Sequence, residues 1–520
     1  MKILSYHFGH DGSITFLEGN RIVYHSQLER FNKFKSNSVP SRELILELKK
    51  RNIQADIFIL TWVFENNWCK TIIELFKRNN IITSKTQIAI IGRKEHHAYH
   101  ALCAFQFTKY TEANVYVYDG HGASFYDNDT LLEEAVSGYI FKDQIIEAFK
   151  IYYASKDNDT YDNNIPECGV AYAKLTHSLG FKYNEDGKTM AFATYGKPNE
   201  NISSFLNDNF TFKRPFFHGS NGYVPVQNLE RKLTTGEYDD YSKDVAWRIQ
   251  KDFEEKAIHD IKKFIEKFPC KNLIITGGCA QNIFTNTRLL NELDVNIEID
   301  PLCNDQGLSL GVAIKCALET GAKRVDRFDD VFLGFNPEYN LDIFKDYKVV
   351  DANDTDIVNL LKNKEVIALF SGRSEQGQRG LGHRSLLVDA NLEDARERIS
   401  KIKERAWYRP FACSILEEDF KEYFETNNLN KSPYMLYVFK MKNPIKSIVS
   451  KDGYSRVQTV DIENTKYYNL LTEYKKTTGI PYILNTSLNL PGEPLVENLE
   501  DLKYTFENIK DCKKQRKIKD

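Results

Sequence analysis

Apolar and polar residues alternate along the first thirty residues of the chain. Segment 2–31 reads KILSYHFGHDGSITFLEGNRIVYHSQLERF, which predicts three strands separated by a tight turn and by a Gly-Asn turn. A related pattern returns over 114–141, NVYVYDGHGASFYDNDTLLEEAVSGYIF. In both places a small-residue turn follows a β-rich run, at 9–13 and at 119–124. The pattern indicates an internal duplication, with a chance likeness of two hairpins as the alternative.

Helical periodicity dominates the middle of the chain. The clearest helix is predicted over 241–268, followed by a buried strand, NLIITGG at 272–278, and a second helical segment over 282–293. Strand, Gly-Gly and helix in this order form an α/β unit. Two strand-turn-strand units that flank a nucleotide are typical of the actin-like, sugar kinase-like ATPase fold. We therefore expect a duplicated domain of that class in the N-terminal part.

A Gly-, Pro- and Asn-rich stretch at 332–340 separates this region from the rest of the chain. Apolar strands such as EVIALF, YMLYVFK and PYILNTS follow it, interspersed with short helices. A chain of 520 residues also exceeds what a single hydrophobic core supports. We expect an α/β protein of two domains, an actin-like domain over 1–340 and a second α/β domain over 341–520.

Charge and cysteine usage narrow the class of protein. A net charge of -3 argues against a chain that coats nucleic acid. No apolar run approaches the roughly eighteen residues of a membrane helix, and segment 1–16 lacks the apolar run of a signal peptide. Nine scattered cysteines without a C-x-x-C pair predict reduced thiols. We expect a cytoplasmic protein with no membrane partner.

The sequence EHHAYHA at 95–101 contains a candidate metal site. His96 and His100 are four residues apart on a predicted helix, so both imidazoles project from one face. A surface or core pair of histidines is the alternative. Asp305, in a Gly-flanked turn after an apolar segment, is the best candidate for a third ligand. Two imidazoles and one carboxylate suit ferrous iron or zinc.

Glycine-rich turns after strand-like runs form a second candidate site. Glycine lets a backbone N–H approach phosphate oxygens without a side chain in the way, although most glycines simply make turns. We expect this domain to bind the phosphates of a nucleotide through Asp119, Gly120, Gly187, Lys188, Gly277, Gly278 and Asn282.

His10 and Asp11 follow the first predicted strand. A histidine in a turn beside an acid can act as a general base near neutral pH. A hydrogen-bonded turn residue is the alternative.

A dense basic and polar set occupies the last domain. The cations lie in turn-like, half-apolar contexts without acids opposite them, which predicts a pocket for a polyanion such as a triphosphate and a second phosphate. Asn485 and Ser487 follow the strand PYIL and can add neutral hydrogen bonds. The cationic candidates are Arg373, Arg379, Arg384, Lys403, Arg405, Arg409 and Arg456.

Taken in order, these motifs resemble the carbamoyltransferase family of nodulation-factor and antibiotic biosynthesis, which includes the tobramycin and cephamycin enzymes. The resemblance covers almost the whole chain. Its motifs are GHDGS (9–13), HHAYHA (96–101), DGHG (119–122), GKTMAFATYG (187–196), GGCAQNIFTN (277–286), NDQGLSLG (304–311), GRSEQGQRGLGHRS (372–385), RPFA (409–412), DGYSRVQT (452–459) and LNTSLNLPGEP (484–494).

The resemblance implies a division of labour. The last domain would have a YrdC-like fold, bind ATP with Mg²⁺, and convert carbamoyl phosphate to carbamoyl adenylate. The actin-like domain would then pass the carbamoyl group to a hydroxyl. By the family pattern, His96, His100 and Asp305 bind Fe²⁺ or another divalent ion, and His10 takes the acceptor proton. The resemblance is compatible with a homodimer.

Two other functions remain as alternatives. One is a non-catalytic, nucleotide-binding regulatory module, and the other is a tRNA threonylcarbamoyl-type transferase. The acceptor hydroxyl is open: a small molecule, a sugar or a hydroxymethylated nucleobase would serve, although the net charge does not indicate a nucleic acid. The aromatic-rich segment 201–223 is a candidate for stacking on an acceptor ring, and ordinary loop packing is the alternative.

Overall fold

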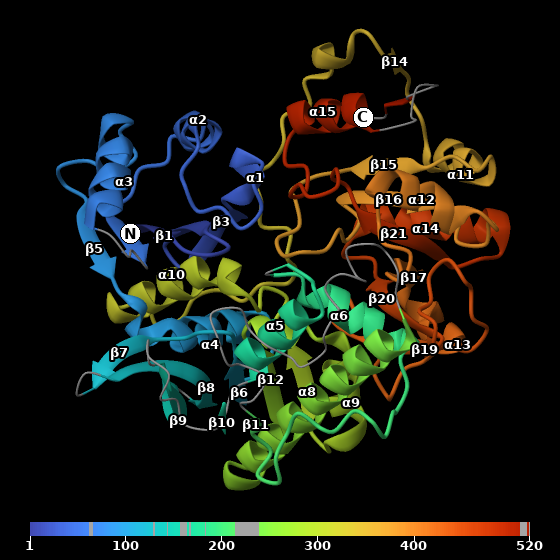
Figure 1. The fold of residues 1–520 in the computed structure, drawn as a ribbon. Coiled ribbons are helices and arrows are strands. Elements are labelled where there is room, and N and C mark those ends of the chain that lie inside the picture. Colours follow the sequence, from blue (N-terminus) through green and yellow to red (C-terminus); the bar gives the residue numbers. More distant parts are fainter. Residues whose placement is uncertain are drawn as a thin grey trace.

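The computed structural model describes residues 1–61, 66–127, 130–142, 144–155, 164–165, 168–182, 184–213, 239–509 and 517–518. The last ten residues of the aromatic-rich segment, 214–223, lie outside this part. Figure 1 shows two N-terminal sheets and their helices on one side and the C-terminal part, in orange and red, on the other.

The first sheet has the strand order β3-β2-β1-β4-β5. β1, β2 and β3 are antiparallel neighbours, whereas β4 runs parallel to β1 and β5 runs parallel to β4. The strands are β1 (Lys2–His7), β2 (Ser13–Glu18), β3 (Arg21–Gln27), β4 (Ile57–Thr61) and β5 (Gln87–Ile91).

The second sheet repeats this arrangement. β9, β8 and β6 are antiparallel neighbours, β12 runs parallel to β6, and β13 runs parallel to β12. The same order and directions confirm the predicted duplication and the actin-like, sugar kinase-like fold. The strands are β6 (Glu112–Tyr118), β8 (Thr130–Lys142), β9 (Gln144–Ser155), β12 (Asn272–Thr276) and β13 (Asn296–Ile299), with β7 (Ser124–Asp127) paired to β8.

Two helices are packed between these sheets. α4 (His96–Gln106) packs on the second sheet, α10 (Leu308–Glu319) packs on the first, and the two helices contact each other. Their apolar faces share one core with both sheets. The outer faces are covered by α2 (Arg42–Lys50) and α3 (Asn66–Arg78) on the first sheet, and by α5 (Cys168–Ser178), α6 (Asp186–Phe192), α8 (Asp240–Lys267) and α9 (Ile283–Glu292) on the second.

Local sequence accounts for the clearest of these elements. α8 begins where the Asp239 side chain accepts a hydrogen bond from the Ser242 N–H, and its apolar stripe faces the core. The helix predicted over 241–268 and the strand predicted at 272–278 are both confirmed, the strand as β12. Among the described residues, no helix is long and apolar enough to cross a membrane.

The C-terminal part forms a mixed seven-stranded sheet in the order β15-β16-β21-β17-β20-β19-β18. Its strands are β15 (Ile367–Phe370), β16 (Arg384–Val388), β17 (Ala412–Leu416), β18 (Phe424–Glu425), β19 (Val438–Met441), β20 (Tyr454–Val460) and β21 (Tyr482–Ser487). Its helices include α11 (Asp354–Lys362), α12 (Ala395–Lys403), α14 (Thr465–Thr478) and α15 (Leu499–Asn508).

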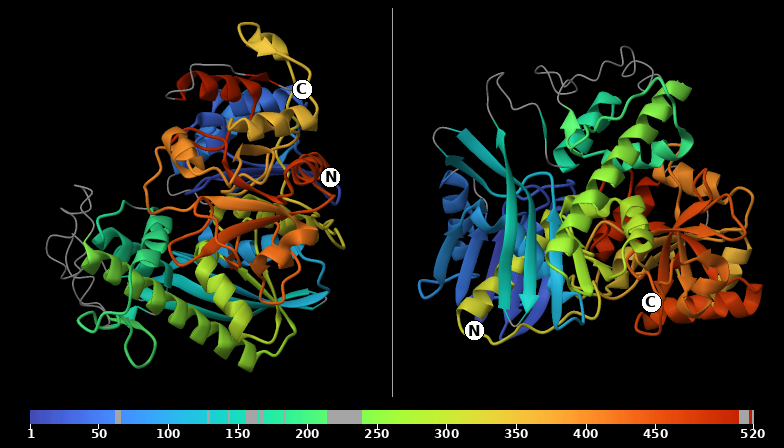
Figure 2. Two further views of the ribbon diagram at one scale, coloured as in Figure 1. Left: turned by 90° about the vertical axis from the view of Figure 1, so that its right-hand side faces the viewer. Right: turned by 90° about the horizontal axis from the view of Figure 1, so that it is seen from below.

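The N-terminal and C-terminal parts are joined by a continuous interface. The Asn286 side chain donates a hydrogen bond to the Leu436 carbonyl at 2.9 Å, and the Val438 N–H donates to the Thr287 hydroxyl at 2.9 Å. The Tyr408 ring packs against Phe192 with centroids 5.3 Å apart. Seen from below in Figure 2, the green middle helices lie between the blue and cyan strands and the orange and red C-terminal part.

Candidate metal centre and active-site cleft

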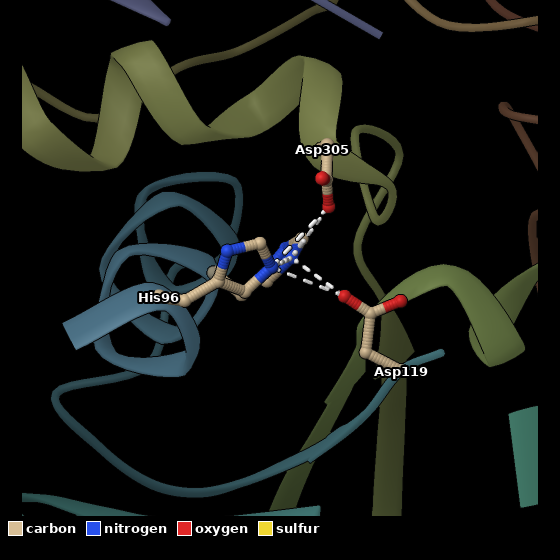
Figure 3. Close-up of side chains that lie close together, drawn as sticks. His96, Asp119 and Asp305 are labelled. Carbon is tan, nitrogen blue, oxygen red and sulfur yellow. Dashed lines mark hydrogen bonds and ion pairs between the residues drawn. The ribbon is translucent and has the colours of Figure 1, made fainter. Parts of the chain in front are cut away.

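Four side chains from three distant segments meet in a buried cluster (Figure 3). His96 and His100 lie in the first turns of α4, Asp119 directly follows β6, and Asp305 begins the short 3₁₀ turn that leads into α10. The Nε2 atom of His96 lies 3.2 Å from Asp119 Oδ2 and 3.3 Å from Asp305 Oδ1. The Nε2 atom of His100 lies 3.3 Å and 3.4 Å from the same two oxygens.

This geometry fits a divalent ion. Nitrogen and oxygen ligands bind Zn²⁺ at about 2.0–2.2 Å, so at angles between a right angle and the tetrahedral angle two ligands are roughly 3.0–3.5 Å apart. The histidine–carboxylate contacts fall in that interval, and the two Nε2 atoms are 3.3 Å apart. Two imidazoles and two carboxylates form a mixed donor set that suits iron or zinc.

The imidazoles and carboxylates of the cluster shift one another's pKa values. Burial lowers the pKa of His100, but its hydrogen bonds to Asp119 and Asp305 outweigh burial and raise this pKa to about 10. Burial raises the pKa of Asp305, yet the neighbouring His96 charge and the hydrogen bond from His100 hold it well below its usual range. A divalent ion would replace these imidazolium protons as the positive charge between the carboxylates.

Asp119 is placed differently from its sequence-based assignment. We predicted it as part of a nucleotide-binding turn, whereas the structure puts its Oδ2 atom in the metal cluster. Its Oδ1 atom accepts hydrogen bonds from the Gly120 N–H at 2.8 Å and the Gly278 N–H at 3.0 Å. The adjoining turn requires glycine at 277, because φ is +90° there and a Cβ would lie 2.2 Å from the Tyr118 carbonyl oxygen.

His10 lies at the rim of the same site. Its Nδ1 atom is 3.1 Å from Asp11 Oδ2, and its Nε2 atom receives a hydrogen bond from the Asn184 side chain at 3.0 Å. Asp11 also accepts hydrogen bonds from Ser36 at 2.8 Å and from Asn304 at 3.0 Å. Asp11 thus orients the His10 imidazole, and the His10 side chain remains 47% exposed.

One cleft of about 2220 Å³ connects this site with the C-terminal part. Its N-terminal wall contains most of the predicted turn residues, namely Asp119, Gly120, Gly187, Lys188, Gly278 and Asn282, together with His10, Asp11 and Asp305. Lys188 also pairs with Glu185 at 2.5 Å, and the Asn282 side chain caps α9. Gly277 does not line the cleft. It forms the backbone turn that places the neighbouring Gly278 there.

The opposite wall collects positive charge. Five cationic side chains lie on this wall, and within the described part of the chain no carboxylate oxygen lies within 4.0 Å of any of their nitrogen atoms. Burial, followed by repulsion from Arg409, lowers the pKa of Arg379 to about 10, and burial with mutual repulsion also lowers the pKa of Arg405 and of Arg456. Clustered cations with no carboxylate this close are suited to binding a polyanion. They are Arg379, Lys403, Arg405, Arg409 and Arg456.

Neutral polar groups of segment 485–489 lie beside these cations on the same wall. The Lys403 ammonium donates hydrogen bonds to the Ser487 carbonyl and to the Asn489 carbonyl, each at 2.9 Å. Asn485 uses its side-chain N–H groups on Ser414 at 2.9 Å and on the Gly380 carbonyl at 3.2 Å. Its Oδ1 atom is buried without a hydrogen-bond partner among the described residues.

Two predicted cations lie away from the cleft. The Arg384 guanidinium is fully buried and donates to the backbone carbonyls of 371, 372, 383, 496 and 497 at 2.9–3.1 Å. The Arg373 guanidinium donates to the Gly334 and Leu333 carbonyls at 2.6 Å and to the Val23 carbonyl at 2.9 Å. Both connect backbone segments, and neither lines the cleft.

The sequence argument missed Lys35. It lies between two residues with left-handed backbone, Lys33 and Ser36, in a loop anchored where Ser36 binds Asp11. From this loop it lines the cleft, where burial lowers its pKa; the Glu29 charge opposes this shift, and the charges of Arg409 and Arg379 add to it. A lone lysine in a polar loop has no distinguishing pattern, so only the approach of the two parts reveals it.

The fold and its charged cleft define a two-part α/β enzyme. Family models described as carbamoyltransferase N-terminus and carbamoyltransferase C-terminus match residues 47–314 and 358–511. The chain therefore belongs to the carbamoyltransferase family, and it is a carbamoyltransferase.

Relatives extend over most of the chain. It is 30% identical over 470 residues to the uncharacterized protein MJ1058 of Methanocaldococcus jannaschii, covering 82% of this chain and 75% of the relative. It is 26% identical over 550 residues to the nodulation protein NolNO of Sinorhizobium fredii, covering 96% and 77%. It is 28% identical over 444 residues to the nodulation protein NolO of Bradyrhizobium diazoefficiens, covering 79% and 75%.

Proposed function

We propose that this carbamoyltransferase is ATP-dependent and acts in two steps on a hydroxyl acceptor. In the first, carbamoyl phosphate, ATP and water give carbamoyl adenylate, phosphate and pyrophosphate. In the second, the acceptor oxygen attacks the carbamoyl carbon, the bond from that carbon to the AMP phosphate oxygen breaks, and AMP leaves. The observation that carries this proposal is the set of five cations that form no ion pair with any described carboxylate, in the same cleft as the histidine–carboxylate cluster.

We assign adenylate formation to residues 341–520, as a YrdC-like domain. ATP carries four negative charges and carbamoyl phosphate carries two, and both would enter with Mg²⁺. These phosphates would be bound by Arg379, Lys403, Arg405, Arg409 and Arg456, since each faces the cleft and pairs with no carboxylate of the described residues. Asn485 and Ser487 would add neutral hydrogen bonds. Arg373 and Arg384, predicted as ligands, would instead maintain the fold of this wall.

We assign carbamoyl transfer to residues 1–340. His96, His100, Asp119 and Asp305 would hold Fe²⁺ or another divalent ion, which when bound would polarise the carbamoyl carbonyl. Gly120 and Gly278 fix the Asp119 carboxylate through their N–H groups.

The proton of the acceptor hydroxyl would go to His10. The Asp11 carboxylate orients its Nδ1–H, which leaves Nε2 as the accepting atom in place of its contact with Asn184. The continuous cleft would let carbamoyl adenylate pass between the two sites without release.

Pyrophosphate release tests the first step. We expect release only when ATP and carbamoyl phosphate are both present, and formation of one added carbamoyl group when hydroxyl acceptors are screened by mass spectrometry. Release that requires threonine and bicarbonate would indicate a threonylcarbamoyl-type enzyme instead. Tight ATP binding without any turnover would indicate a regulatory module, and either result would overturn the proposal.

A further inference from the structure

A third histidine on α4 faces away from the candidate metal centre. His97 is adjacent to His96, but it points toward β8, where its Nδ1 atom lies 2.9 Å from the Ser137 hydroxyl and 3.4 Å from Glu134 Oε1. All three of these side chains are fully buried. The helix that carries His96 and His100 is therefore tied to the second sheet through a polar contact in an otherwise apolar core.

The same carboxylate holds the loop that carries Asp119. Glu134 Oε2 accepts a hydrogen bond from the Ala123 N–H at 2.9 Å. The Glu134 backbone adds two more bonds: its carbonyl accepts from the Gly122 N–H at 2.8 Å, and its N–H donates to the Ala123 carbonyl at 2.7 Å. Residues 119–123 are thus attached to the metal cluster at one end and to Glu134 at the other.

The loop fits directly against this pair. A Cβ added at Gly122 would lie 2.6 Å from His97 Nε2 and 2.7 Å from Glu134 Oε2, so the backbone approaches both side chains closely. The Glu134 charge is balanced by the Ser137 hydroxyl, which donates at 2.5 Å, and by the Lys150 ammonium at 3.6 Å. Each carboxylate oxygen therefore has its own donors.

We infer that His97 and Glu134 are positioning residues that fix the Asp119 carboxylate against His96 and His100. This inference rests on the metal-binding role proposed for the cluster. A metal ligand must be held to within a few tenths of an ångström, and outer partners of metal ligands supply that constraint. Glu134 does so through the backbone of 119–123, and His97 does so by anchoring α4.

The direct test is Glu134→Gln. A glutamine amide offers one oxygen and one NH₂, so either the Ala123 N–H or the donors around Oε1 must face another donor. Full-length protein freed of metal by a chelator would be titrated with Co²⁺, with the metal absorption as readout. We expect the Co²⁺ affinity to fall by about 10–100-fold, as is typical when an outer partner of a ligand is lost, while ATP affinity changes by less than about twofold.

Asp252→Asn is the matched control. Asp252 is an equally buried carboxylate that accepts from the Phe205 N–H at 2.6 Å and the Ser204 hydroxyl at 3.0 Å, with Arg248 at 2.6 Å. It has the same types of partner but no link to the cluster, so Co²⁺ affinity should be unchanged. His97→Asn, which keeps a polar group near Ser137, provides a milder second variant if Glu134→Gln does not fold, and it should also weaken Co²⁺ binding.

The outcomes separate the two claims. Wild-type protein that fails to bind Co²⁺, Zn²⁺ or Fe²⁺ would overturn the metal centre and, with it, this inference. Wild-type protein that binds Co²⁺ with the same affinity and spectrum as folded Glu134→Gln or His97→Asn would overturn the positioning role alone. An equal loss in Asp252→Asn would do so as well, because it would attribute the effect to general loosening of the core.

Discussion

Arg379 and Arg384 lie five residues apart in one motif, yet their removal should change stability in opposite directions. Burial, followed by repulsion from Arg409, lowers the pKa of Arg379 by more than two pH units, to about 10. Each pH unit is worth about 1.4 kcal/mol, so the charge destabilises the folded, ligand-free protein by roughly 3 kcal/mol. Arg379→Met removes that charge and should stabilise the protein.

Arg384→Met should do the reverse. It leaves the carbonyls of 371, 372, 496 and 497 without this donor, whereas the His383 carbonyl keeps the Ser371 N–H at 3.0 Å, and each unsatisfied buried group costs about 1–3 kcal/mol. Even with partial relaxation, we expect a loss of about 3–5 kcal/mol, as for breaking a buried charged network. Thermal unfolding without ligand should therefore show a Tm above wild type for Arg379→Met and well below it for Arg384→Met.

Binding gives the second half of the test. A charge-assisted hydrogen bond is worth about 1.5–3 kcal/mol, so Arg379→Met should weaken ATP binding by roughly 10- to 150-fold in calorimetry. The stability gain should persist at every pH below about 10, because in that range wild-type Arg379 stays protonated in both folded and unfolded states. A variant that is less stable than wild type and binds ATP normally would refute the reasoning.

Four further outcomes are expected. His100→Ala should lose the bound ion by elemental analysis and abolish carbamoyl transfer while keeping ATP binding; full metal occupancy would contradict the ligand assignment. His10→Asn should slow carbamoyl transfer by about 10²–10⁴-fold with unchanged pyrophosphate release, and normal transfer kinetics would reduce His10 to a turn residue. Lys35→Met should weaken ATP binding by about 1.5–3 kcal/mol, and unchanged calorimetry would remove it from the site. Burial raises the pKa of Asp300 to about 6 from 3.8, so its contribution to stability is present at low pH and is lost as pH rises through about 6. The unfolding free energy of Asp300→Asn should therefore rise by roughly 3 kcal/mol relative to that of wild type as the pH increases from 4 to 7. Unfolding free energies of the two proteins that change in parallel with pH would contradict this.

Local patterns account for much of the fold. The helix over 241–268 follows from its apolar period, and the duplication follows from two strand-turn-strand units, because both signals depend on neighbours within a few residues. The pairing of His96 with His100 has the same origin, since an i, i+4 spacing places two side chains on one helix face whatever the tertiary structure.

Which residues form the metal centre and the cleft depends on contacts between segments that are distant in the sequence. Asp119 follows a strand with a Gly turn, which resembles many phosphate-binding turns, but its distance from His96 depends on how α4 packs on β6. Lys35 enters the cleft only because the N-terminal loop faces the C-terminal cations.

Arg379 and Arg384 belong to one sequence motif, but their different roles cannot be distinguished from that motif. The sequence by itself determined the periodic elements, the repeated half and the concentration of cations in the last domain, since these are properties of residue types and short spacings. Only the tertiary structure decided that Arg384 is saturated by backbone carbonyls while Arg379, among the residues that the structure describes, forms no ion pair. The physical reason is that a guanidinium binds whichever acceptors the packed backbone presents to it, and two of the five acceptors of Arg384, the carbonyls of Val496 and Glu497, come from a segment more than a hundred residues away.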